Sequence, residues 1–202
     1  MDSNILSLPG YRMCEYLLIL RPHEELRNKI INTKKEFAGK FEVPSEKIGK
    51  PHITLATFQQ IQMMEERIVN RLRMIAMAMP AFKVELKDFG SFPSHTIYIN
   101  VASQVPIQIL VKSLKPAQSL MKTKEVKPYF ADTPHLTVAR KLLPWQYEKG
   151  WLEYSNKHFA GRFIASSMLL LRRPDGFKSY QPVQSFEFMN MPVVTTQGKL
   201  FA

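Results

Sequence analysis

The sequence predicts an α+β protein built from a duplicated unit in two lobes. A strand–helix–strand–helix–strand order spans residues 15–92 and recurs over residues 95–173, an offset of about 80 residues. Each copy carries the string Pro-His-x-Thr at the start of its second strand. The 202 residues, 45% of them hydrophobic and 22% charged, suit a single bilobal domain with a shared core.

The first unit begins with an apolar run over residues 15–20 that is rich in strand formers. Pro22, followed by Glu24 and Glu25, is typical of the first turn of a helix. An apolar stripe extends this helix to residue 41. Alternation and proline stops predict the other elements: a polar loop over 42–50, a strand over 51–58, a helix over 61–79 and a strand over 82–86.

The second unit repeats this order with similar spacing. Leu17 precedes His52 by 35 residues, and Tyr98 precedes His135 by 37. The predicted elements are a strand over 95–101, a helix over 106–121 that Pro116 breaks or shortens, a strand over 134–140, a helix over 145–160 and a strand over 163–171. A weak strand over 180–190 and a patternless tail complete a C-terminal segment over 180–202. The alternation of strands and helices allows antiparallel as well as parallel pairing.

Composition narrows the class of partner and the compartment. The chain has 28 Lys and Arg against 17 Asp and Glu, a net charge of +11 that favours nucleic acid first and phosphorylated small molecules second. Cys14 is the single cysteine, which excludes an intrachain disulfide and fits a reducing compartment. The first residues lack a basic export signal, and no stretch is apolar enough to span a membrane. We therefore expect a cytoplasmic protein.

The repeated string carries the chemistry. Residues 51–56 read Pro-His-Ile-Thr-Leu-Ala, and residues 134–139 read Pro-His-Leu-Thr-Val-Ala. Side chains two positions apart on a strand share a face, so each histidine projects with the threonine that follows it. The apolar residues between them face the other way, where helices can cover them. If a two-fold axis brings the strands together, two imidazoles and two hydroxyls line one cleft.

Two histidines and two hydroxyls suit phosphodiester chemistry without a metal. A neutral histidine takes a proton from the attacking oxygen, and a protonated histidine gives one to the leaving oxygen, because an imidazole pKa of about 6.5 permits both states near neutrality. Hydroxyl groups can donate to nonbridging phosphate oxygens. Which histidine acts as base depends on the direction of the reaction.

The two H-x-T strings, their spacing and the duplicated units resemble the two-histidine (2H) phosphoesterase superfamily. The similarity is greatest to its 2′-5′ RNA ligase-like branch, the RNA 2′,3′-cyclic phosphodiesterases, and residues 134–140 are especially similar. The resemblance covers about residues 15–190. It implies two antiparallel sheets facing a central cleft, with helices outside. It also implies the active-site set His52, Thr54, His135 and Thr137, which in such enzymes opens a 2′,3′-cyclic phosphate to a 2′-phosphate or joins 2′-5′ linkages.

Two further substrate contacts are predicted. Arg140 follows the second motif and is placed to attract a phosphate, with solvated surface charge as its alternative interpretation. Members of the superfamily often carry an aromatic residue that stacks on the base. The candidates for this position are Tyr129, Phe130, Phe177 and Tyr180, of which we select Tyr180.

The sequence therefore favours a phosphodiesterase that acts on RNA ends or small cyclic nucleotides without a metal or other cofactor. An RNA-binding module with weak or no catalysis is the main alternative, because the net charge alone would support RNA binding. A zinc hydrolase that recruits Asp132 as a third ligand is a weaker one. The sequence does not determine the oligomeric state, and we expect a monomer.

Overall fold

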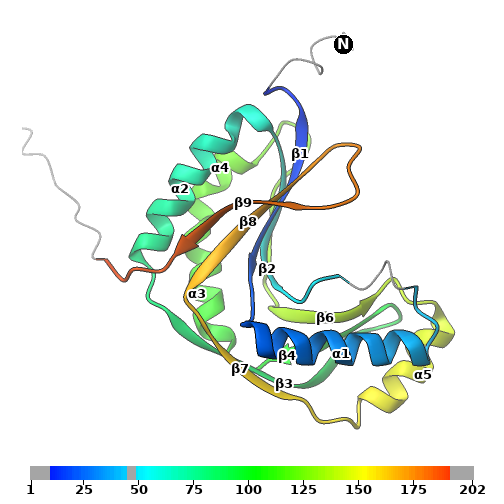
Figure 1. Ribbon diagram of the computed structural model, residues 1–202. Helices are drawn as coiled ribbons and strands as arrows, with labels where there is room; N and C mark the ends of the chain where they lie inside the picture. Colours follow the sequence, from blue (N-terminus) through cyan, green and yellow to red (C-terminus); the bar gives the residue numbers. More distant parts are fainter. Residues whose placement is uncertain (1–9, 45–48, 192–202) are drawn as a thin grey trace, which may run out of the picture.

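A computed structural model of the protein describes residues 10–44 and 49–191 and contains two antiparallel sheets (Figure 1). The strands are β1 (Met13–Leu20), β2 (Ile53–Ile61), β3 (Phe82–Phe92), β4 (Thr96–Val101), β5 (Tyr129–Phe130), β6 (His135–Arg140), β7 (Ala160–Ala165), β8 (Ser167–Pro174) and β9 (Gln181–Glu187). One sheet has the order β5-β2-β1-β8-β9 and the other the order β6-β4-β3-β7. The predicted α+β class with antiparallel sheets is confirmed.

Helices lie outside both sheets in Figure 1. They are α1 (Glu24–Lys40), α2 (Glu65–Ala78), α3 (Gln104–Leu114), α4 (Gln118–Met121) and α5 (Pro144–Tyr154), with short 3-10 turns η3 (Gln62–Met64) and η4 (Lys115–Ala117). Pro116 interrupts the second unit's first helix, as predicted. Across the described part of the chain, no helix combines the length and the apolar character that crossing a bilayer requires.

The first helix of each unit packs against the other sheet, not against the sheet that holds the strand before it. Helix α1 follows β1 of the five-stranded sheet but contacts β6 and β7 of the four-stranded sheet. Helix α3 follows β4 of the four-stranded sheet and contacts β2 of the five-stranded one. This exchange joins the two lobes, because neither sheet could bury its apolar face with the helices of its own unit alone.

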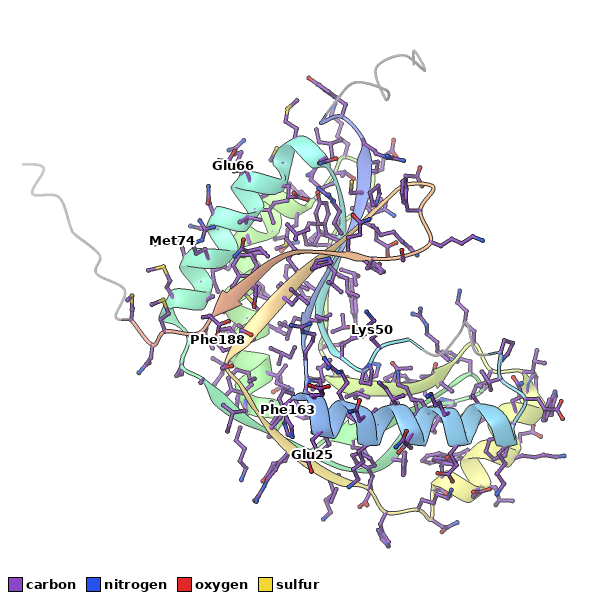
Figure 2. The ribbon with its side chains drawn as sticks, viewed as in Figure 1. Glu25, Lys50, Glu66, Met74, Phe163 and Phe188 are labelled. Carbon is purple, nitrogen blue, oxygen red and sulfur yellow. The ribbon has the colours of Figure 1, made fainter. Side chains whose placement is uncertain are left out.

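Alternation along β1 separates two apolar clusters. Tyr16, Leu18 and Leu20 are fully buried in the main core that the outer helices cover. Leu17 and Ile19 point to the opposite face, where they form a small cluster with Leu169, Leu171 and Tyr180. Each fully buried large apolar side chain stabilises the fold by about 1.5–3 kcal/mol. The face away from the helices is therefore partly apolar and partly polar, and Figure 2 shows the side chains that cover both faces.

Several predicted element boundaries are wrong. The helix predicted over 145–160 ends at Tyr154, and the strand predicted over 82–86 extends to Phe92. Residues 163–171 do not form one strand, because the chain crosses between the sheets at Ser166 and divides the run into β7 and β8. The run over 163–171 is mostly apolar, and its pattern does not indicate where the chain passes from one sheet to the other. The predicted helix over 61–79 begins only at Glu65, because β2 extends to Ile61 through its pairing with Met13.

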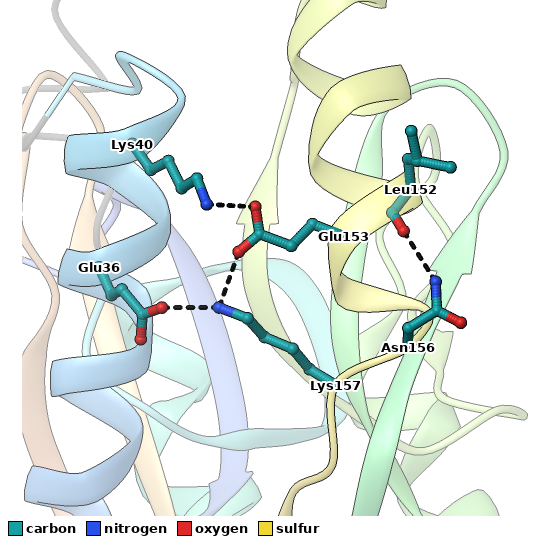
Figure 3. A network of polar contacts seen from close by, with 6 residues as sticks. All are labelled: Glu36, Lys40, Leu152, Glu153, Asn156 and Lys157. Carbon is teal, nitrogen blue, oxygen red and sulfur yellow. Dashed lines mark hydrogen bonds and ion pairs between the residues drawn. The ribbon is translucent and has the colours of Figure 1, made fainter.

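Polar contacts connect α1 with α5 on the four-stranded sheet. Figure 3 shows Lys157 Nζ on Glu36 Oε1 at 2.7 Å and on Glu153 Oε1 at 2.9 Å. These side chains are solvent-accessible, so each pair contributes only about 0–1 kcal/mol. The buried Gln146 is the stronger connection, because its amide satisfies groups from three different residues. Its Nε2 donates to the carbonyls of Phe41 and Glu42, and its Oε1 accepts from the Leu143 amide.

We expect Gln146→Ala to lower the free energy of unfolding by about 2 kcal/mol, because it leaves buried backbone groups without partners. Urea unfolding followed by circular dichroism measures the change. Gln108→Ala, at an exposed position on α3, is the matched control and should stay within about 0.5 kcal/mol of wild type. Equal losses in the two variants would contradict the role given to Gln146.

Candidate functional site

The two motif histidines lie where the sheets meet. His52 immediately precedes β2, His135 is the first residue of β6, and these two strands are in contact. The charge of His135 is among the causes that lower the pKa of His52, so the imidazoles lie within electrostatic reach of each other. Both side chains are half-buried. The structure therefore brings together two histidines that are distant in the sequence.

Matching backbone contacts orient both rings. Nδ1–H of His52 donates to the carbonyl of Lys50 at 2.8 Å, and Nδ1–H of His135 donates to the carbonyl of Thr133 at 2.8 Å. A carbonyl can only accept, so Nδ1 carries the hydrogen in each ring and the lone pair of the neutral form lies on Nε2. His95 makes the same contact with Pro93 in an exposed turn, so the bond alone does not define a site.

Each motif strand contains a β-bulge directly after its threonine. In β2 the pairing with β1 skips Leu55, and in β6 the pairing with β4 skips Val138. The two residues after each threonine are consequently both buried. The third residue after the threonine then points to the same face as the histidine. These third residues are Thr57 in the first unit and Arg140 in the second. Strict alternation would have turned Arg140 away from His135, so the bulge places it beside the motif.

Aromatic side chains enclose the ring of His135. Phe92 packs edge-on at 4.9 Å between ring centroids, and Tyr98 lies at 5.0 Å. Tyr98 pairs with Thr137 across the strands and with Gly90 on its other side. A Cβ on Gly90 would stand 2.6 Å from the Tyr98 ring and 2.5 Å from Asn100 Oδ1, so only glycine leaves room for this arrangement. We refer to Gly90, Phe92, Tyr98 and Asn100 as the His135 pocket.

Positive charge and burial act together on His52. Burial lowers its pKa most, and the charges of Lys34, Arg140 and His135 lower it further, against the hydrogen bond to Lys50. The neutral form of His52 therefore persists to a lower pH than that of an ordinary histidine. Lys34 comes from α1, and its proximity to His52 depends on the packing of that helix against β6.

The five-stranded sheet contributes the opposite part of the site. Thr54 pairs with Ile19, and Thr57 pairs with Leu17 and with Tyr129 of the edge strand β5. Tyr180 belongs to the small apolar cluster on this face. One side of its ring is covered by the guanidinium of Arg173, 4.9 Å from the centroid. Thr54 and Thr57 therefore lie beside the small apolar cluster of the five-stranded sheet. Tyr129 lies toward one edge of this sheet and Tyr180 toward the other.

The predicted site residues on the two sheets lie close enough to influence one another electrostatically. His52, His135 and Arg140 interact electrostatically, and the charge of Arg140 also reaches Tyr180. Burial raises the pKa of Tyr180, which keeps its phenol protonated. Of the other aromatic candidates, Tyr129 pairs with Thr57 at the edge of the five-stranded sheet. Phe130 instead packs on the main core, and Phe177 lies under the guanidinium of Arg12. Sequence analysis missed Lys34, Thr57 and the His135 pocket.

The carboxylate of Asp132 makes hydrogen bonds within its own turn. Its Oδ1 accepts a hydrogen bond from the Thr133 amide at 2.8 Å and one from the Tyr129 hydroxyl at 3.5 Å. Within residues 10–44 and 49–191, no three His, Cys, Asp or Glu side chains gather into a set that could hold a metal ion. Asp132 instead shapes the turn whose Thr133 carbonyl orients His135.

Comparisons with known proteins relate this chain to one family and one fold. Residues 21–176 match the family described as the 2′-5′ RNA ligase superfamily. The crystal structure of E. coli LigT complexed with 3′-AMP aligns with a TM-score of 0.60 at 14% identity, covering 87% of this chain and 98% of that one. The crystal structure of TT0787 from Thermus thermophilus aligns with a TM-score of 0.61 at 16% identity, with the same coverages of 87% and 98%. No curated protein sequence matches the chain.

Gly90→Ala should disturb the His135 pocket, because the new methyl group displaces the Tyr98 ring from its contact. The ring protons of His135, which sense the ring currents of Phe92 and Tyr98, should change chemical shift in proton NMR, while those of His52 stay unchanged. Overpacking should also destabilise the fold by about 1–3 kcal/mol. Gly39→Ala, with no atom within 4 Å of the added carbon, is the control. A folded Gly90→Ala variant with unaltered His135 signals would refute the steric argument.

Proposed function

Because the chain belongs to the 2′-5′ RNA ligase superfamily of two-histidine phosphoesterases, we propose that it is a metal-independent phosphodiesterase that opens 2′,3′-cyclic phosphates of RNA ends or small nucleotides. The observation that carries this proposal is the matched pair His52 and His135. Each ring is held through Nδ1 by a backbone carbonyl, and each has Nε2 available for proton transfer. Such a pair supplies a base and an acid without a metal.

We assign His52 as the base for ring opening, because its lowered pKa favours the neutral form that a base needs. Neutral His52 takes a proton from water through Nε2 as the water oxygen forms a bond to phosphorus. Protonated His135 gives its Nε2 proton to the ribose 3′ oxygen as the bond from phosphorus to that oxygen breaks, and a 2′-phosphate remains. Each positioned transfer is worth roughly 10²–10⁴ in rate. The same pair acting in the same direction, with a 5′-hydroxyl in place of water as the attacking group, would form a 2′-5′ linkage and release the 3′ oxygen as a hydroxyl.

Four other residues complete the proposed site. The hydroxyls of Thr54 and Thr137 donate to nonbridging oxygens of the phosphate, where negative charge develops. Arg140 neutralises the phosphate with a charge-assisted hydrogen bond. Tyr180, which is half-buried beside the small apolar cluster, stacks on a base. A nucleotide complex of the same fold is represented by LigT with 3′-AMP, which supports nucleotides as ligands.

Catalysis should survive chelation and require both histidines. With 2′,3′-cyclic AMP in EDTA, we expect turnover to a 2′-phosphate, identified by phosphorus NMR, and a loss of at least roughly 100-fold in kcat/KM for His52→Ala and for His135→Ala. His95→Ala, which removes a histidine with the same backbone contact outside the site, should retain activity. Wild-type RNA binding without any product would instead identify an RNA-binding module, which the net charge of +11 would also permit.

The pH profile should report the charge of Arg140. The base must be neutral, so the acidic limb of kcat/KM should lie below the ordinary histidine pKa of about 6.5. Arg140→Gln removes a positive charge that opposes protonation of His52, so this limb should move to higher pH. Lys141→Gln, the exposed neighbour, is the control. An acidic limb that does not move in Arg140→Gln would remove His52 from the role of base.

A cytoplasmic location and a monomeric state remain predictions from the sequence. Within the described residues the surface shows single exposed apolar side chains on several elements, such as Met74, Ile109 and Leu152. Scattered residues of this kind are normal for a monomer. Sedimentation of the purified protein would measure its mass directly.

A further inference from the structure

Lys34 is a buried lysine close to the proposed site. It lies on α1 and has only 5% of its surface exposed, whereas lysine is among the residues least often buried. Its Nζ donates to the carbonyl of Gly49 at 2.8 Å. Burial, together with the charge of Arg140, lowers its pKa to about 8. Keeping an ammonium group here is costly, so its presence calls for a physical explanation.

Two hydrogen bonds on successive carbonyls connect Lys34 with the motif. Lys34 holds the carbonyl of Gly49, and the carbonyl of the next residue, Lys50, holds Nδ1–H of His52. Figure 2 labels Lys50 on the segment that leads into β2. The position and ring orientation of His52 therefore depend on a segment whose attachment to α1 is the Lys34 ammonium. A positioning residue of this kind affects catalysis by a neighbour's geometry rather than by contact with the reacting atoms.

Charge gives Lys34 a second effect on the same site. Lys34 faces Arg140 from β6 and His52 at the start of β2, and its charge lowers the pKa of His52. The site therefore places one permanent cation, Arg140, and one cation that is mostly charged at pH 7, Lys34, beside the motif imidazoles. Like charges in a partly buried place repel, and an anion that enters between them removes that repulsion.

A purely structural role would make Lys34 an anchor for the loop before β2. A neutral hydrogen-bond donor would be enough to hold the carbonyl of Gly49. Burying a charged ammonium group only for that purpose is unfavourable. The mutual electrostatic influence of Lys34, Arg140 and His52 is not explained by anchoring alone. The hydrogen bond of Lys34 to Gly49 anchors the loop, and a bound phosphate or sulfate would account for the charge that Lys34 retains.

We propose that Lys34 is a positioning residue of the two-histidine site, which fixes His52 through the Gly49–Lys50 carbonyls and completes a cationic recess that favours a tetrahedral oxyanion. The assignment of this anion as the substrate phosphate rests on the proposed function. The link between Lys34, His52 and an inorganic oxyanion does not, so it can be tested without turnover.

The experiment follows the ring protons of His52 and His135 by NMR across pH 5–10, with and without sodium sulfate. Sulfate remains a dianion throughout this pH range, so any change in its affinity reflects a change in the charge of the protein. Lys34→Met retains the length of the side chain but removes its charge and its donor. We expect the His52 titration to move to higher pH and sulfate affinity at pH 7 to fall by about tenfold or more, as loss of one nearby charge implies. Lys35→Met, on the exposed side of α1, should change neither.

A second variant tests the charge where Lys34→Met folds poorly. Wild-type sulfate binding should weaken as pH rises through about 8, because Lys34 is charged below its lowered pKa and neutral above it. Lys34→Arg should keep its affinity to higher pH, since a guanidinium stays protonated. Identical pH dependence of sulfate binding in wild type and Lys34→Arg, or unchanged His52 titration in folded Lys34→Met, would overturn the proposal.

Activity then separates this proposal from the proposed function. If 2′,3′-cyclic AMP is turned over, Lys34→Met should lose roughly 10–100-fold in kcat/KM, with the loss shared between kcat and KM. If wild type shows no turnover but the sulfate and His52 results hold, the oxyanion recess stands and the phosphodiesterase assignment fails. If turnover is normal in Lys34→Met, the histidines act without this residue and the positioning role is wrong.

Discussion

The contact between β2 and β6 depends on the exchange of helices between the two sheets. Helix α1 leaves the five-stranded sheet to cover the four-stranded one, and α3 makes the reverse crossing. Each sheet can bury its apolar face only while the other lobe is in place. The distance between the two motif strands is therefore fixed by the whole core rather than by loops. The proposed proton transfer by this pair would need such rigidity, because small misplacements of reacting groups cost large factors in rate.

A nearly symmetric scaffold carries an asymmetric set of functional groups. Both motif strands have the same histidine anchor, the same threonine and the same bulge after it. The position that the bulge returns to the site holds Thr57 in one strand and Arg140 in the other. The surroundings of the rings differ as well, since His135 lies among Phe92 and Tyr98, whereas His52 lies in the field of cations. Only the surroundings of His52 combine burial with several positive charges, and they lower its pKa.

The repeated string was sufficient to predict that two histidines meet and that the chain has two similar units. The antiparallel pairing of the sheets was predicted by the family resemblance, because the alternation of strands and helices left it open. The surroundings of the pair were not predictable. The placement of Gly90 against Tyr98 depends on strand register, and that of Lys34 depends on α1 packing against the other lobe's sheet. Both are set by long-range pairing rather than by local pattern. The bulges follow the same rule, since strict alternation assigns Arg140 to the wrong face. The crossing at Ser166 lies inside an apolar run that gives no sign of it.

The exchanged helices also bear on how such a chain can be divided. The turn between β3 and β4 separates the two units in sequence, and it is exposed at Ser94. A fragment that ends there contains α1 without most of the sheet that α1 covers, so it has an apolar helix face and no surface to bury it. Its complement lacks β1 and β2 of the five-stranded sheet, and β2 is the strand that α3 contacts. Each half therefore depends on strands of the other half to bury its exchanged helix, so cutting the chain at this turn exposes an apolar helix face in both fragments.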